Sequence, residues 1–411
     1  MILIMKKDKI LFNPFDPEFH ANPYPILDRL RQEDPIHKSI FGTWIITRYA
    51  DAVSILNDKR FEVDNLPERL QLKSAYLKEG NLQTLSQTID RWLFFLNPPD
   101  HTRLKKIITP VFSPTALEAI RPKIQVMVDE LLAKVKQKGE MDIITDLANP
   151  LAALTIAEII GLPKEDYEKL IHWSSEQIFI LEHPRSLEDY QYRNQVIIEN
   201  KEYLVEKVAE CKKQPSNDSL ISHLINQNNT ENQLTEDEII SACMLINTTA
   251  QGTTSSLIGN GVLALLNHPE SLVYLQQNPN EIKNAVEEFL RYDSPTQSVA
   301  RKPIEDVAIA GKIIPSGDTV VIHIGAVNRD PEQFTNPNQL DFTRQNRHIA
   351  FGGGIHHCLG IFLAKIEAQI AINTLIQNLP DIRINTDKLD RRDSIALRGL
   401  KTLPVKFTPV A

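Results

Sequence analysis

The stretch Phe351-Gly-Gly-Gly-Ile-His-His-Cys-Leu-Gly360 decides the fold of this chain. It surrounds a single cysteine, Cys358, with four glycines, and an apolar run of helical spacing from Ile361 to Ile376 follows directly. Cys358 is therefore expected at a helix N-terminus, where unpaired N–H groups and the helix dipole stabilise a thiolate. Glycine also lets the backbone approach a flat, bulky group closely. Because a thiolate can be the axial ligand of haem iron, the stretch predicts a haem site with Cys358 as the metal ligand.

Composition narrows the class of protein. The 411 residues are 42% hydrophobic and 24% charged, as in ordinary globular chains. A net charge of −8 and the lack of a long basic run argue against a nucleic-acid partner. The apolar start, Met1–Met5, is too short to span a bilayer, and no later stretch looks apolar enough, so no membrane anchor is expected. Three cysteines do not make a disulfide framework, which predicts a cytoplasmic protein.

The periodicity predicts a mostly α fold with a small β region. Helices are expected at 115–138, 142–161, 164–180, 186–212 and 217–227, and strands at 36–38, 43–47, 307–310 and 319–324. Residues 60–95 lack a clear period and predict a loop or lid. The turn around His183-Pro184 is expected to separate two helices of a movable flap. No repeat or linker is evident, so we expect one domain over residues 1–411.

A long helix is predicted between Thr235 and Asn267. Thr235-Glu-Asp-Glu238 has the pattern of a capping box, and His268-Pro269 would end the helix. Few charges occur in its middle, so it is expected to cross the interior. Most side chains in 247–256 nevertheless carry a hydroxyl or an amide, which are costly to bury. Polar groups there predict a functional site.

With Glu288-Phe-Leu-Arg291 placed seventy residues before Cys358, the chain resembles the bacterial cytochromes P-450 over nearly its whole length. That family of haem-thiolate monooxygenases carries Glu-x-x-Arg and, later, Phe-Gly-x-Gly-x-His-x-Cys-x-Gly. The resemblance implies the cytochrome P-450 fold and haem b, with Phe351 and Gly352 at the start of the cofactor loop. It implies insertion of one oxygen atom from O2 into a small organic substrate.

The resemblance also assigns roles around the cofactor. His101, Lys105, Arg301 and His356 match positions that hold haem propionates, although the family more often has arginine where Lys105 stands. The plainer alternative for His101 and Lys105 is a solvated helix face. Glu288 and Arg291 would form a buried structural pair with an arginine from the loop before the cysteine; Arg344 and Arg347 are both candidates.

The long helix departs from the family pattern Ala/Gly-Gly-x-Asp/Glu-Thr-Thr, because this chain reads Thr249-Ala-Gln-Gly-Thr-Thr254. Thr253 falls on the family's alcohol that hydrogen-bonds dioxygen, unless it only bonds back to its own helix. Gly252 stands where the family has a proton-delivering carboxylate. Gln251, Asn247, Thr248 or ordered water are candidates to replace that carboxylate.

Two kinds of enzyme remain open from this departure. One is a monooxygenase with a water-based proton relay, which we favour because Thr253 is present. The other is an atypical haem-thiolate enzyme that uses peroxide, reduces nitric oxide or isomerises its substrate. A haem-based sensor that turns nothing over is a third reading.

Family position predicts a substrate pocket walled by Asn247, Thr248, Val299, Ile395 and Leu397, besides the 60–95 loop. The identity of the small-molecule substrate does not follow from these residues. No flavin- or iron–sulfur-binding segment is evident, so electrons are expected from a separate ferredoxin or flavodoxin with its reductase.

Overall fold

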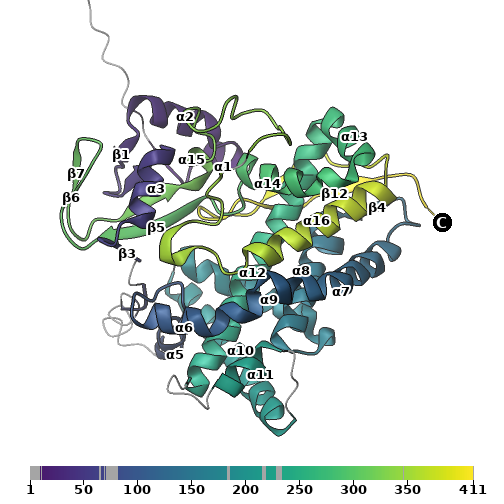
Figure 1. The fold of residues 1–411 in the computed structure, drawn as a ribbon, viewed down its shortest axis with the longest axis horizontal. Helices are drawn as coiled ribbons and strands as arrows, with labels where there is room; N and C mark the ends of the chain where they lie inside the picture. The colour runs from purple at the N-terminus through teal and green to yellow at the C-terminus, as the bar shows by residue number, and fades with distance from the viewer. Residues whose placement is uncertain are drawn as a thin grey trace, which may run out of the picture.

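The computed structural model describes residues 10, 12–63, 66–68, 70, 82–182, 186–214, 219–227, 234–345 and 347–410. Within these ranges helices dominate; of the four sheets, the five-stranded one and β6–β7 lie on one side and the sheet of β4 and β12 lies on the other (Figure 1). The predicted mostly α class with a small β region is confirmed. The flap turn at 183–185 and residues 64–65, 69 and 71–81 of the irregular 60–95 stretch lie outside the described residues.

The largest sheet gathers the N-terminal hairpin with strands from the second half of the chain. Its order is β1-β2-β8-β5-β3, with β2 and β8 parallel and the other neighbours antiparallel. The strands are β1 (Ile36–Lys38), β2 (Trp44–Ile46), β8 (Val320–His323), β5 (Ser298–Pro303) and β3 (Phe61–Glu62). The helices of this part are α1 (Pro17–Ala21), α2 (Tyr24–Glu33), α3 (Tyr49–Asn57) and α15 (Ile324–Val327).

The predicted run of helices between 115 and 230 is confirmed within a few residues at most ends. It consists of α7 (Pro114–Ala133), η2 (Ile143–Ala148), α8 (Asn149–Ile160), η3 (Lys164–Asp166), α9 (Tyr167–Ile178), η4 (Phe179–Glu182), α10 (Leu187–Lys213) and α11 (Leu220–Asn226). Local capping explains the agreement. Ser113, Ser186 and Ser219 accept N-terminal N–H bonds, and Gly161 ends α8 with a left-handed φ of 92°. Before this run come α5 (Gln83–Ile89), α6 (Asp100–Ile108) and η1 (Thr109–Phe112).

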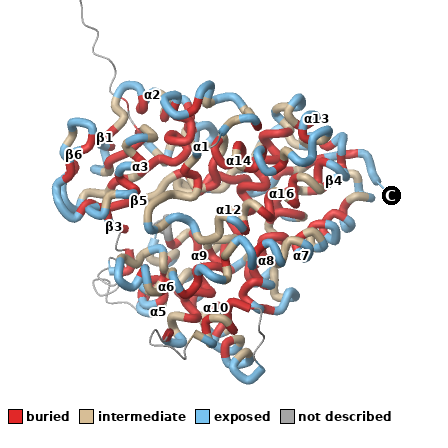
Figure 2. Tube along the Cα trace, viewed as in Figure 1, coloured by how far each residue is buried: buried red, intermediate tan, exposed pale blue. Residues whose placement is uncertain are grey.

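The long helix α12 (Glu236–Asn267) crosses the middle of the protein, as predicted (Figures 1 and 2). Thr235 and Glu238 form the full capping box, and His268 caps the other end. It packs against α8, α9, α14 (Ile282–Tyr292) and α16 (Ile361–Asn378). Two further helices, α13 (Pro269–Gln277) and η6 (Pro279–Glu281), follow it. Helix α12 and the cysteine helix α16 are therefore neighbours in the core.

Short strands were missed by the sequence prediction. They are β4 (Glu140–Asp142), β12 (Pro404–Lys406) and β9 (Arg383–Ile384) in one sheet, β10 (Asp390–Arg391) with β11 (Leu400–Thr402), and β7 (Lys312–Ile314), which pairs with the predicted strand β6 (Val307–Ile309). Strands of two or three residues are too short to show alternation.

One expectation about apolar stretches was wrong. Residues 143–160 are long and apolar enough by composition to cross a membrane, with a mean hydropathy of 1.5. In the fold, however, 72% of this stretch is buried inside the protein as η2 and α8. Such mostly buried helices also occur in the cores of globular proteins.

Candidate active site

The cysteine loop folds tightly against α3. The N–H of Cys358 donates to the carbonyl of Phe351 at 3.1 Å, and Gly352 donates to Ile349 at 2.9 Å. Gly354 has a φ of 65°, and a Cβ there would lie 2.0 Å from the carbonyl oxygen of Leu56. Only glycine fits this position, because both the backbone conformation and the contact exclude a side chain. The loop contains the short helix η7 (Gly354–His356), just before Cys358, and leads into α16.

The Cys358 thiol is partly enclosed by protein. Its side chain is reached by solvent, yet burial raises the pKa of the thiol. The two observations agree if protein surrounds the sulfur on most sides while one side stays open. The N–H of Gly360 and the ammonium of Lys105 act in the opposite direction and lower this pKa. The expected stabilisation of a thiolate by an N–H group is therefore present, but burial outweighs it.

Three basic side chains converge beside the cysteine loop. The rings of His101 and His356 lie 4.3 Å apart, and Nε2 of His356 is buried without a hydrogen-bond partner. Burial lowers the pKa of His101 to about 4, of His356 to about 3 and of Arg301 to about 10. Among the described residues, no carboxylate contributes to these three shifts.

A desolvated group of basic side chains without an anion fits a dianionic ligand. Two propionates would give Nε2 of His356 the acceptor that it lacks and would give His101 and Arg301 an anionic partner, while Cys358 would meet the metal. The residues present therefore fit haem.

Lys105 lies on the same helix, α6, as His101, but its ammonium is directed elsewhere. Nζ donates to the backbone carbonyls of Ile355 and His357. Lys105 thus holds the cysteine loop through two of its backbone carbonyls. Its contact with a propionate stays a prediction. The exposed His357 contributes its carbonyl to this clamp.

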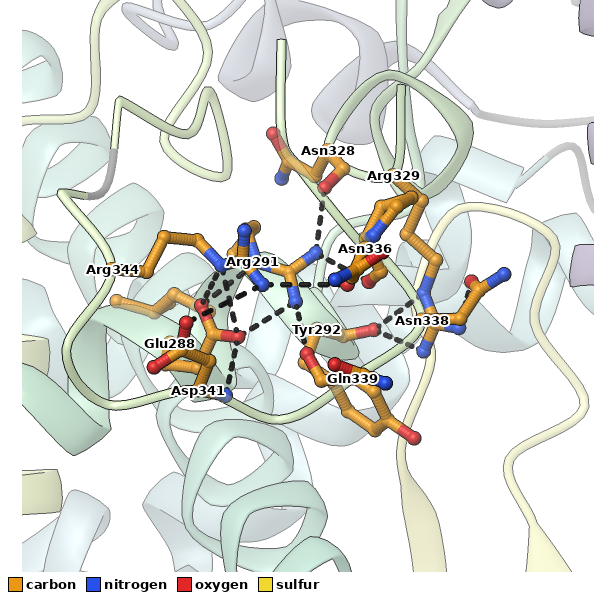
Figure 3. Close-up of polar contacts among 12 residues, drawn as sticks. Glu288, Arg291, Tyr292, Asn328, Arg329, Asn336, Asn338, Gln339, Asp341 and Arg344 are labelled. Atoms are coloured by element: carbon orange, nitrogen blue, oxygen red, sulfur yellow. Dashed lines mark hydrogen bonds and ion pairs between the residues drawn. The ribbon is translucent and has the colours of Figure 1, made fainter. Parts of the chain in front are cut away.

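Glu288 and Arg291 form a fully buried ion pair on α14 (Figure 3). Nε and Nη2 of Arg291 donate to the carboxylate of Glu288 at 2.8 and 2.7 Å. Arg344 completes the group, with Nε 3.4 Å from Glu288, so the structure selects it over Arg347.

The remaining donors of this arginine fix the chain before the cysteine loop. Arg291 donates to the carbonyls of Asn328, Pro337 and Gln339, and the N–H of Asp341 donates to Glu288 at 3.0 Å. The pair is therefore a structural anchor for residues 328–341.

In the centre of α12, hydroxyls and amides bond locally. The hydroxyl of Thr253 donates to the Thr249 carbonyl at 2.7 Å, the back-bonded arrangement that we gave as its alternative reading. The amide nitrogen of Gln251 donates to the side-chain oxygen of Asn247, and the amide nitrogen of Asn247 donates to the Leu170 carbonyl of α9. Gln251 and Asn247 thus form a short amide chain that runs toward α9.

Thr248 is also bound to α9. Its hydroxyl lies 2.6 Å from Oε1 of Gln177 and 2.8 Å from the Met244 carbonyl. Both Asn247 and Thr248 are buried and hold α12 to α9. Their place on a substrate wall stays a prediction. By contrast, the turn with Ile395 and Leu397 lies beside the segment that leads to Val299, since Leu397 bridges to Thr296.

Gly252 lies against an arginine that the sequence prediction missed. A Cβ built on Gly252 would be 3.3 Å from Nη1 of Arg392. Arg392 follows β10, whose hairpin with β11 packs on this part of α12. Nothing in the local pattern Arg391-Arg392-Asp393 signals that contact, because it joins residues 140 positions apart.

Comparison with known proteins agrees with the fold. The family model for cytochrome P450 matches residues 177–393. The biotin biosynthesis cytochrome P450 of Bacillus subtilis is 40% identical over 395 residues, 95% of this chain and 97% of the relative. The polyketide biosynthesis cytochrome P450 PksS of the same organism is 36% identical over 98% of this chain and all of its own. The vitamin D(3) 25-hydroxylase of Pseudonocardia autotrophica is 34% identical over 96% of both chains.

Solved structures give the same answer. P450BioI, crystallised with an acyl carrier protein ligated to hexadec-9Z-enoic acid, superposes with a TM-score of 0.88 at 40% identity, covering 95% of this chain and 99% of that one. A myxobacterial cytochrome P450 in complex with myristic acid gives 0.87 at 34% identity, covering 96% and 98%. Together with Cys358, its basic surroundings and the Glu288–Arg291 anchor, these matches establish that the chain belongs to the cytochrome P450 family of bacterial haem oxidoreductases.

Proposed function

We propose that this protein is a monooxygenase that inserts one atom of dioxygen into a small, largely apolar substrate such as an acyl chain. The observation that carries the proposal is the cysteine loop: Cys358 is exposed to solvent beside the desolvated basic residues His101, His356 and Arg301. Relatives named as a hydroxylase and as biosynthetic cytochromes P450 support the reaction class. The two neighbours solved with acyl ligands support the substrate class.

The chain's residues divide the work around the cofactor. Haem b bound through the Cys358 thiolate supplies the redox chemistry and the activation of dioxygen. His101, His356 and Arg301 would hold its propionates, and Lys105 would hold the cysteine loop in place. Phe351 and Gly352 would set the start of that loop, because the Phe351 carbonyl accepts the N–H of Cys358.

Proton delivery must follow a route without a carboxylic acid at position 252. The Thr253 hydroxyl donates to its own helix and must rotate away before it donates to anything in the site. The side chains of Gln251 and Asn247 form a hydrogen bond with each other, but amides do not ionise and so do not replace the acid. We therefore assign the relay to ordered water that reaches Thr253 along this amide chain.

A second candidate is the atypical haem-thiolate enzyme, such as one that uses peroxide. The guanidinium of Arg392 lies beside Gly252, where the family pattern has an acid. This favours the second candidate, because a guanidinium keeps its proton and does not deliver it to the site. An enzyme supplied with peroxide has less need of proton delivery along this helix.

We propose that electrons come from a separate ferredoxin or flavodoxin with its reductase, in the cytoplasm. The face beside Cys358 offers a docking patch of exposed apolar and basic groups, with Ile355 and Phe362 exposed by 52% and 43%. Lys106 is exposed on the adjoining helix α6. The chain is proposed to act as one domain.

The first experiment is the absorption spectrum of the reduced, carbon monoxide-bound protein. A red-shifted Soret band is expected for wild type and for Cys211→Ser, which removes a cysteine remote from the loop. The band should be lost in Cys358→Ser. Its absence in wild type would contradict a thiolate-bound haem.

The second experiment separates the two candidate reactions. Isotope-labelled dioxygen is supplied with NADPH, a ferredoxin and its reductase, and the product is analysed by mass spectrometry. Label in the product supports the monooxygenase. Product that forms only with added hydrogen peroxide, without label from dioxygen, supports the peroxide-using alternative.

A further inference from the structure

A small hollow lies between the N-terminal segment and the C-terminal loop. It has a volume of about 30 Å³ and is bordered by Phe19 and His20, by Gln297, and by the loop from Arg391 to Gly399. A buried water needs roughly 10–15 Å³ of such space, so the hollow accepts about two waters or one small head group. It is too small for a whole substrate.

The charge around this hollow is one-sided. Among the described residues that line it, Arg391, Arg392 and Arg398 are arginines and none is a carboxylate. Burial lowers the pKa of the neighbouring His323 to about 3, so this ring is neutral. The hollow therefore favours an anion.

Arg398 is already committed to the protein. Its Nε donates to Asp293 at 2.7 Å, and its two Nη atoms donate to the carbonyls of His20 and Ala21. Arg391 differs, because its Nη1 is buried without a hydrogen-bond partner. Burial and the charge of Arg398 lower the pKa of Arg391, although Asp293 acts against them. A buried donor without an acceptor costs free energy, so a ligand that supplies the acceptor binds favourably.

Arg392 connects this hollow with the central helix α12. It borders the hollow, and its Nη1 lies 3.3 Å from a Cβ built on Gly252. The family's carboxylate is replaced there by a positive charge, which attracts an anion of the ligand. Ile395 and Leu397, on the same loop, line the hollow with apolar side chains.

We propose that this hollow binds the carboxylate of an otherwise apolar substrate, held by the guanidinium groups of Arg391 and Arg392, while the chain passes Ile395 and Leu397. The inference rests on the proposed function and names its substrate class: long-chain carboxylic acids with a free carboxylate. Two guanidinium forks match carboxylate geometry, and the volume suits a carboxylate better than a bulkier phosphate. An acyl group linked to a carrier by its carboxyl carbon offers no such anion at that end.

The test compares dodecanoate, its methyl ester and dodecyl phosphate on haem-loaded protein at neutral pH. Binding is measured by isothermal titration calorimetry and by the shift of the haem from low to high spin. Wild type is expected to bind the acid at least roughly tenfold more tightly than the ester, the size of one charge-assisted hydrogen bond. Equal affinities for acid and ester, or a preference for the phosphate, would overturn the proposal.

Variants locate the anion. Arg391→Gln and Arg392→Gln should each weaken acid binding by roughly tenfold and leave ester binding unchanged, and Arg391→Lys should lie between. The matched control Arg383→Gln, which removes an exposed arginine on β9, should change neither affinity. Equal losses for acid and ester in both glutamine variants would refute an anion site.

Two further measurements distinguish a failure of the anion site from a failure of the proposed function. Circular dichroism shows whether each variant is folded, and Arg392→Gln serves if Arg391→Gln is not. If the thiolate Soret band were missing in wild type, the monooxygenase proposal would fail, but the calorimetric preference for acid over ester would still decide the anion site.

Discussion

Gly252 of α12 and Arg392 of the C-terminal loop lie against each other, with only 3.3 Å between a Cβ at Gly252 and Nη1 of Arg392. The glycine and the arginine depend on one another in this packing. A larger residue at 252 would need the guanidinium to move, and the guanidinium occupies the space that an acidic side chain would enter. The family pattern has an acidic residue at position 252, whereas this chain has a glycine there with the guanidinium of Arg392 beside it.

This relationship gives a prediction for Gly252→Glu. The new carboxylate should pair with Arg392, so that proton delivery improves only partly in the single variant and more in Gly252→Glu/Arg392→Gln. Product and hydrogen peroxide are measured per NADPH with an ester substrate. Gly252→Ala is the control, since it adds the Cβ without the acid. If the glutamate variants release as much peroxide as the alanine variant, no proton relay limits the reaction.

The buried pair on α14 predicts a large effect of Glu288→Gln. Arg291 and Arg344 would lose a carboxylate partner in a site where both Glu288 and Arg291 are fully buried. Breaking such a pair costs about 3–5 kcal/mol, so haem content and urea stability should both fall. Glu33→Gln, which breaks an exposed pair with Arg29, should cost less than about 1 kcal/mol. Similar stabilities of the two variants would argue against the anchor role.

Two adjacent glycines predict opposite outcomes. Gly354→Ala places a Cβ 2.0 Å from the Leu56 carbonyl at a φ of 65°, so the cysteine loop cannot close. Gly353→Ala meets only the Leu56 side chain, at 3.3 Å, with an extended φ of −170°. We expect loss of the thiolate Soret band for Gly354→Ala and its retention for Gly353→Ala. Equal spectra would mean that the loop is not held against α3.

Replacing Lys105 is expected to change how firmly haem is retained, but not the absorption spectrum. Lys105→Met removes the donor to the carbonyls of Ile355 and His357 and loosens the loop. Haem transfer to excess apomyoglobin should become several-fold faster while the Soret maximum stays in place. The neighbouring exposed Lys106→Met should leave the transfer rate unchanged. A shifted Soret maximum would indicate that Lys105 acts on the iron ligand itself.

Glu367 on α16 predicts a pH dependence of stability. Burial raises its pKa to about 8, and its Oε1 has no hydrogen-bond partner. In the folded chain Glu367 therefore keeps a proton that it releases in the unfolded chain, where its pKa is about 4.3. Stability should fall as the pH rises between these two values and level off above the folded-state pKa.

Glu367→Gln should remove that slope. Wild type should lose about 1.4 kcal/mol of stability for each pH unit between the two pKa values, whereas the variant should lose none from this position. The variant should therefore be the more stable protein at pH about 8 and similar to wild type below pH about 4. Urea unfolding followed by circular dichroism measures this. Parallel pH profiles of the two proteins would show that the carboxyl ionises normally.

The elements that sequence patterns predicted well are those that local chemistry defines. Helix α12 begins at its capping box and ends before Pro269, so its bounds needed no distant contact. The short strands are different. Strand β4 pairs with β12 across more than half of the chain, and three residues of each give no period to detect.

The roles of single residues likewise divide into those that the sequence predicted and those that only the fold showed. Choosing Arg344 over Arg347 required the folded loop, because both lie at similar distances along the chain from Glu288. Lys105 shared a helix with His101 as expected, but only the docked cysteine loop showed that its partners are backbone carbonyls.

The sequence by itself determined the thiolate loop, the Glu288–Arg291 pair and the central helix, because each is a short pattern whose chemistry depends on neighbouring positions. Only the tertiary structure decided what faces Gly252. Arg392 reaches it through a hairpin that packs on α12, and the hollow beside Arg391 exists only once the N-terminal segment and the C-terminal loop meet. Contacts between distant segments are set by packing, which leaves no local pattern along the chain.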